Sequence, residues 1–359
     1  MIPVIPAPVP VPLPAPPWLL EALLVFTFIL HLVPMNFLLG GVVMLAVSSF
    51  RGYRDAKHRE FTRRAAQSLP VVVAFTITLG VAPLLFLQVL YGQLFYTSSV
   101  LMAWFWLAVV LLVLLGYYGV YWFNLQQEEL GNRAPWVMLA VAVVFIHVAL
   151  IFSRNMNAML SPQDFYPRFL QGQVGTIFGP MTNVALARFL HIFVGALGVA
   201  GLGAAWLSRL WRRDVPEFAP WAERYGLLWF HAGIGCEFLI GFWYLFSLPR
   251  DVRAQFLGNS QLSTLLMVAG MILAVVALAA AKRSLGIATA ALAGSLSTMA
   301  VMRHLVRVAY LKPYFDLSAA PVRGQWTVFV LFVVLLVGGI AVVAWMLRIF
   351  FRSAAPRTR

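Results

Sequence analysis

The sequence predicts an all-α membrane protein, a bundle of nine transmembrane helices, and three observations lead to this fold class. Of the 359 residues, 62% are hydrophobic and only 11% are charged, whereas about a quarter of the residues of a soluble domain carry charge. The mean hydropathy of +0.87 is also too high for a soluble globule. Finally, the apolar residues form nine runs long enough to cross a bilayer, which takes roughly 20 residues of helix.

Each apolar run is expected to be one helix, because backbone groups in hydrocarbon must be satisfied inside a helix or a closed barrel. Barrel strands would alternate apolar and polar residues, and these runs do not. Residues 1–17 contain eight prolines and no Lys or Arg, so they predict an extended arm rather than a signal peptide. Residues 18–351 then form one transmembrane bundle, and residues 352–359 form a cytoplasmic tail. The predicted spans are 18–50, 68–94, 99–123, 135–153, 183–211, 225–248, 260–281, 284–311 and 325–351.

The basic residues predict the orientation of the bundle. The C-terminal tail and the connections after spans 1, 3, 5 and 7 hold 17 of the 26 Lys and Arg residues, and the other side of the membrane holds 9. The positive-inside rule therefore places the N-terminus outside, on the periplasmic side, and the C-terminus in the cytoplasm. The basic residues that give the net charge of +14 lie in the loops between the apolar spans. There they set the topology and face anionic lipid, so we do not expect a nucleic-acid-binding protein.

Several polar side chains share the outer half of the predicted bilayer. His147, His191, His304 and Met267 lie about six to eight residues inside the outer ends of their spans, roughly 9–12 Å at 1.5 Å per residue, and His31 is somewhat deeper. Imidazole and thioether are the usual axial ligands of haem iron, and helix bundles build such sites from facing helices. For each histidine alone, an interhelical hydrogen bond is the alternative.

Four arginines accompany this layer, and Arg188 stands one helical turn before His191. A guanidinium there can pair with a haem propionate, although snorkelling to the outer headgroups is the alternative for each one. The arginines are Arg154, Arg188, Arg303 and Arg307.

The only cysteine, Cys236, excludes a disulfide framework, an iron–sulfur cluster and a covalent c-type haem.

Two further ionisable residues need an interpretation. Glu237, inside the sixth span, must pair, stay protonated or bind metal. His58, in the basic first connection, is expected to be a solvated loop residue.

Four stretches also carry a family resemblance. They are ARFLHIFVGALGVAGLGAAWLSRLWRRD from Ala187, HLVPMNFLLGGVVMLAV from His31, LGVAPLLFLQVLYGQLFYTSS from Leu79 and TLLMVAGMILAVV from Thr264. These stretches resemble segments of subunit I of the cytochrome bd quinol oxidases, and the resemblance runs in the same order along roughly the whole chain. This chain would be a divergent member of that family. The resemblance implies that His191 and Met267 ligate a low-spin b haem and that His31 ligates a second, high-spin haem.

The sequence also departs from that family. The family's third haem takes a glutamate from the eighth helix, and because that turn has no carboxylate here, His304 is expected to replace it, with His147 and Glu237 as weaker candidates. Gln88 stands where the family has a glutamate, and the third span has no carboxylate. Connection 6–7, LPRDVRAQFLGN, lacks the family's long quinol-binding loop.

These features predict a membrane b-type cytochrome of a bacterial-type inner membrane. We expect it to hold two or three b haems, one of which could be haem d, and to transfer electrons between them near the outer face. It would reduce oxygen or serve another subunit of a respiratory complex, and a c-type cytochrome rather than quinol would feed it. The alternative is a haem-free transporter or structural membrane subunit. Transporters of that kind commonly show paired interrupted helices, and none are evident.

Overall fold

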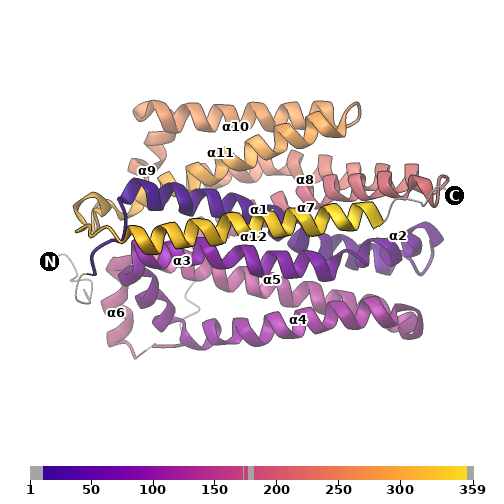
Figure 1. Cartoon of the computed structure of the whole chain (residues 1–359), viewed down its shortest axis with the longest axis horizontal. Coiled ribbons are helices and arrows are strands. Elements are labelled where there is room, and N and C mark those ends of the chain that lie inside the picture. The colour runs from indigo at the N-terminus through magenta and orange to yellow at the C-terminus, as the bar shows by residue number, and fades with distance from the viewer. Residues whose placement is uncertain (1–10, 173, 177–181, 354–359) are drawn as a thin grey trace.

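The computed structural model describes residues 11–172, 174–176 and 182–353, and long helices dominate it (Figure 1). Each predicted span overlaps one of them. Eight helical stretches are long and apolar enough to cross a membrane, and one of these, Ala103–Met159, is two helices, α4 and α5, that pack against each other. The prediction of an all-α membrane bundle is therefore confirmed. The long helices are α1 (Pro17–Arg51), α3 (Leu69–Leu101), α4 (Ala103–Leu130), α5 (Ala134–Met159), α7 (Asn183–Leu210), α8 (Ala219–Ser247), α10 (Gln261–Ala280), α11 (Leu285–Leu311) and α12 (Trp326–Ser353).

Short helices fill three of the connections. Two of them, α2 (Ala56–Ala66) and α6 (Phe165–Leu170), follow α1 and α5, while α9 (Arg250–Ala254) continues into a π-helical turn, η4 (Gln255–Asn259). The side chain of Asp55 caps α2, because its Oδ1 accepts a hydrogen bond of 2.8 Å from the Lys57 backbone N–H. Helix α2 is too short to cross a membrane and was not predicted.

The prediction that His58 is a solvated loop residue is wrong. Its side chain lies on the buried face of α2, and the residue is only 8% exposed. Ser48 Oγ lies 3.0 Å from His58 Nδ1, and the rings of Trp221 and Tyr225 meet the imidazole edge to face at 4.9 and 4.8 Å. The cause is tertiary: α8 begins directly over this helix and covers it with aromatic rings.

Small residues hold α1, α7 and α8 close together. A Cβ atom added to Gly201 of α7 would lie 2.4 Å from the Phe230 backbone nitrogen, and one added to Gly233 of α8 would lie 2.4 Å from the Gly198 nitrogen. A Cβ on Gly40 of α1 would lie 2.1 Å from the Ala196 carbonyl oxygen. Without a hydrophobic force between helices in lipid, such close packing is a main source of association. It fixes three of the five helices that line the candidate site.

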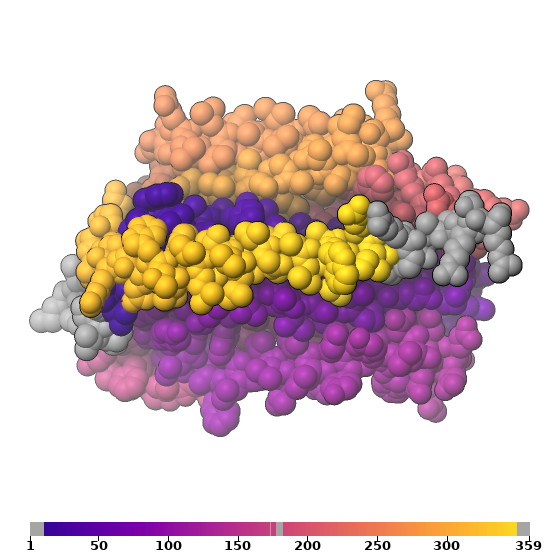
Figure 2. All heavy atoms as spheres, viewed as in Figure 1, coloured from indigo at the N-terminus to yellow at the C-terminus, as the bar shows by residue number. Residues whose placement is uncertain are grey.

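The described part of the N-terminal arm is extended and pairs with the connection before α12. Leu13 N–H donates to the Pro321 carbonyl at 2.7 Å, and Leu13 in turn accepts from Arg323 N–H at 2.9 Å. Beyond this strap, α12 crosses the face of the molecule seen in Figure 2. None of its strongest apolar window is buried, so this face of the bundle is available to lipid.

Candidate functional site

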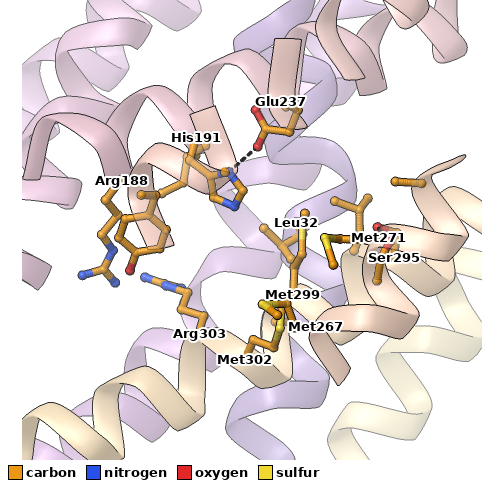
Figure 3. A pocket seen from close by; sticks show the side chains of 18 of the residues that line it. Leu32, Arg188, His191, Glu237, Met267, Met271, Ser295, Met299, Met302 and Arg303 are labelled. Atoms are coloured by element: carbon orange, nitrogen blue, oxygen red, sulfur yellow. Dashed lines mark hydrogen bonds and ion pairs between the residues drawn. The ribbon is translucent and has the colours of Figure 1, made fainter. Parts of the chain in front are cut away.

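A cavity of about 240 Å³ lies between α1, α7, α8, α10 and α11 (Figure 3). One water molecule needs about 10–15 Å³ measured in this way, so the space suits a sizeable ligand. Apolar side chains make most of its wall, and five of them carry sulfur. These are Met35, Met267, Met271, Met299 and Met302.

His191 enters the cavity from α7, next to the carboxylate of Glu237 on α8. His191 Nδ1 and Glu237 Oε1 are 2.5 Å apart, although Nδ1 has no partner in hydrogen-bond alignment within the described residues. The Tyr244 ring stacks on the imidazole at 5.6 Å between centroids. Figure 3 shows one ring nitrogen turned to Glu237 and the other turned into the cavity. His191 therefore presents a free nitrogen to whatever occupies this space.

Met267 lines the same cavity from α10, as the sequence predicted for a partner of His191. In Figure 3 its thioether lies beside those of Met299 and Met302 from α11. The structure therefore brings the imidazole and the thioether of the predicted pair to a single space. Met299 and Met302 line the same cavity. Depth along a helix alone cannot tell which of these methionines lies nearest to His191.

Arg188 and Arg303 from the predicted layer line one end of the cavity, and Arg307 lies one helical turn beyond Arg303 on α11. Arg188 donates to Asn157 Oδ1 at 2.8 Å. The Arg303 guanidinium lies 4.2 Å from the centroid of the Phe28 ring, and its Nε has no hydrogen-bond partner within the described residues. The Arg307 guanidinium lies 5.5 Å from the Tyr91 ring centroid. Arg154 is buried on α5.

None of the ion pairs in the described part of the chain involves Arg188, Arg303 or Arg307. Arg188 and Arg307 are each only 7% exposed. Buried charges are costly unless they are paired. The arrangement therefore favours an anionic group at this end of the cavity.

His304 does not line the cavity, and it contacts a carboxylate, Glu21, that was not predicted as part of a site. His304 Nε2 lies 3.3 Å from Glu21 Oε1 of α1, and His304 Nδ1 is buried without a hydrogen-bond partner among the described residues. Tyr91, whose φ of −129° and ψ of 29° break the helical geometry of α3, also brings a buried ring to this region, next to the Arg307 guanidinium. Glu21 could have been found from the sequence, because it is a carboxylate only a few residues inside the first apolar run.

His31 lies against α3 rather than in the cavity. A Cβ atom on Gly80 would lie 2.9 Å from His31 Cε1, and His31 Nδ1 is buried without a hydrogen-bond partner in the described structure. Ten residues separate His31 from Glu21 on α1, about 15 Å along the helix. That His31 and His304 serve separate haems stays a prediction.

The structure does not bring His147 to these groups. Its side chain is exposed on α5, and its Nδ1 lies 2.9 Å from the Val143 carbonyl oxygen of the same helix. His231 also has a local role, because its ring nitrogens lie 2.7 Å from the Leu227 carbonyl oxygen and 3.3 Å from that of Leu278. It links α8 to α10.

No family model and no curated protein matches this sequence. Among solved structures, the bd oxidase from Geobacillus thermodenitrificans is similar, with a TM-score of 0.67 over 95% of this chain and 99% of that chain. The two sequences are 16% identical. The protein is thus a multi-pass membrane protein with the helical fold of a bd oxidase chain.

Proposed function

We propose that this protein is a membrane b-type cytochrome of the bd oxidase type, a haem-binding subunit of a respiratory complex. The observation that carries the proposal is the cavity into which His191 turns a free ring nitrogen, with the thioether of Met267 in the same space. The bd oxidase fold adds support, because it was expected from the residues around these ligands.

The side chains present fit a haem. Buried polar atoms in native proteins are nearly always hydrogen-bonded, yet three that have no partner among the described residues lie on the predicted haem residues: His31 Nδ1, His304 Nδ1 and Arg303 Nε. Arg188, Arg303 and Arg307, which form no ion pair with another described residue, supply the positive charge that propionate carboxylates need. An apolar wall with one imidazole, thioethers and cations at one end is the donor set of a b haem.

In this proposal His191 and Met267 would hold one b haem, and Arg188 and Arg303 would pair with its propionates. His31 and His304 would serve further haems, either of which could be haem d. A haem supplies one-electron transfer when bound, whereas the protein supplies axial ligands, charge compensation and a dry environment. Arg307 would compensate the site around His304.

The donor in this proposal is a c-type cytochrome on the outer face, and the chain works with other membrane subunits in a bacterial inner membrane, with its N-terminus outside. Connection 6–7 folds into α9 and η4, and Phe256 of η4 is 3% exposed and lines the cavity. Its residues cover the cavity rather than form a separate pocket. For this reason we do not propose quinol as the donor at this connection.

A haem count on the purified full-length chain tests the proposal. We expect a pyridine haemochrome of two or three b haems per chain and an α-band in the dithionite-reduced spectrum. His191→Ala should lose one haem, whereas His147→Ala, a matched control on a membrane helix but away from the cavity, should keep all of them. A folded protein without an α-band would favour the alternative, a haem-free transporter or structural subunit.

A further inference from the structure

Glu237 is the polar group nearest to the candidate ligand His191, and it has no other role in the described structure. It is 8% exposed, and its Oε2 has no hydrogen-bond partner among the described residues. Its Oε1 lies 2.5 Å from His191 Nδ1. The contact with His191 is therefore the main polar interaction of this buried carboxylate among the described residues.

Packing holds Glu237 and His191 together. A Cβ atom on Gly195, one turn after His191 on α7, would lie 3.4 Å from Glu237 Oε1, so a small residue leaves room for the carboxylate. On α8, Gly241 and Tyr244 follow Glu237 on the same face. A Cβ on Gly241 would lie 3.5 Å from His191 Cε1, and the Tyr244 ring covers the imidazole. The imidazole is thereby confined between the two helices.

A neutral imidazole has one N–H and one nitrogen lone pair. With a carboxylate beside Nδ1, the proton is most stable on Nδ1, and the lone pair is then on Nε2, which faces the cavity. A carboxylate behind a ligating histidine also increases the basicity of the ligand and fixes its ring orientation.

We propose that Glu237 is a positioning residue that sets the tautomer and orientation of His191 and, through it, lowers the reduction potential of the haem iron. This inference rests on the proposed function. The negative charge behind the ligand stabilises the oxidised, more positive iron relative to the reduced iron. Loss of that charge should therefore raise the potential.

The test is a redox titration of the haem-loaded full chain with Glu237→Gln, which keeps the shape of the side chain and removes its charge. We expect haem to remain, with at least a tenfold increase in the reduced-to-oxidised ratio at a fixed potential, equal to a rise of about 59 mV for a one-electron couple. Glu237→Asp, which keeps the charge, should restore most of the wild-type potential. Glu223→Gln is the matched control on α8, because Glu223 pairs with Arg209 and Arg212 away from the cavity.

The outcomes separate the two proposals. A wild-type protein without haem would reject the proposed function and this inference with it. Haem in the wild type together with the same potential in Glu237→Gln and Glu223→Gln would reject the inference alone. If Glu237→Gln loses its haem, recovery of haem in Glu237→Asp supports the positioning role, and loss in both variants overturns it.

Discussion

Arg188, Arg303 and Arg307 share one layer of the bundle, where water can solvate their charges only in part. Burial of a cation without a partner costs several kcal/mol, more than most single contacts contribute. Phe28 and Tyr91 offset part of this cost, because a ring face attracts a guanidinium by about 0.5–2 kcal/mol, and their rings lie under Arg303 and Arg307. The part of the burial cost that the rings do not offset would be reduced by a carboxylate bound at this end of the cavity.

Met267→Leu tests the proposal that Met267 and His191 together ligate a haem. The substitution conserves volume, so the fold should survive with a change in stability below about 1.5 kcal/mol. A thioether ligand raises the haem potential, so we expect a lower potential or a high-spin spectrum. Redox titration and optical spectra measure both. Met271→Leu is the control, since Met271 lies in the same cavity, and equal effects of the two variants would remove Met267 from its assigned role.

His58 should make stability depend on pH. Burial lowers its pKa from 6.5, Asp55 opposes this shift, and Arg51 adds to it. Between the lowered pKa and 6.5, the unfolded chain binds more protons than the folded chain, so stability is fully present above pH 6.5 and decreases as pH falls through that window. We expect the melting temperature in detergent to fall more between pH 7.5 and 5.5 for the wild type than for His58→Gln. The same fall in both proteins would contradict this expectation.

At the level of residues, helical rise converts distance along a span into depth, so the sequence could predict that His191 and Met267 lie in one layer, and both line one cavity. That they ligate a haem stays a prediction. The sequence could not identify Glu237 as the neighbour of His191, since that contact depends on the rotation of α7 against α8. Depth alone also grouped His147 with the other histidines. Rotation again explains the difference, because the side chain of His147 is on the exposed face of α5.

At the level of elements, the packing of α7 against α8 positions the site, and Gly233→Ala tests it. The added methyl would lie 2.4 Å from the Gly198 nitrogen, which is backbone and cannot move away. Overpacking of this kind costs about 1–3 kcal/mol, so we expect a lower melting temperature and weaker haem retention at His191. Gly235→Ala, two residues along the same helix, has no atom within 4 Å of the new Cβ.

Gly235→Ala should instead be neutral or stabilising by roughly 0.5–1 kcal/mol, because alanine favours the helical state over glycine. Equal melting temperatures for the two variants would show that close packing of α7 on α8 is not required.

The long helices were predictable because continuous apolar runs in lipid leave few alternatives to a helix. Helix α2 was not predictable in the same way. Its 11 residues are polar on average, and what buries its inner face is distant in sequence: Phe61 packs against Trp221 and Tyr225 at the start of α8. The long helices could be predicted because their own composition determines them. Helix α2 could not, because its burial depends on residues that are distant in the sequence.

At the level of the whole molecule, α1 and α11 take part in two groups of candidate ligands. Helix α1 packs against α3 and α5 on one side and against α7 and α11 on another, as its central place in Figure 1 shows. The cavity with His191 and Met267 lies between α1, α7, α8, α10 and α11. Glu21 and His304 meet where α1 contacts α11, outside the residues that line the cavity.

This division makes His304→Ala a test of how many haems the bundle holds. If His304 ligates its own haem, as we expect, the variant should lose one haem per chain, while the low-spin spectrum of the haem proposed at His191 stays unchanged because His304 does not line the cavity that His191 enters. Pyridine haemochrome counts and reduced-minus-oxidised spectra measure these two quantities separately. The close contact of His304 with Glu21 gives the competing outcome: a full haem complement with only a shifted potential would make His304 an outer-shell group that orients another ligand.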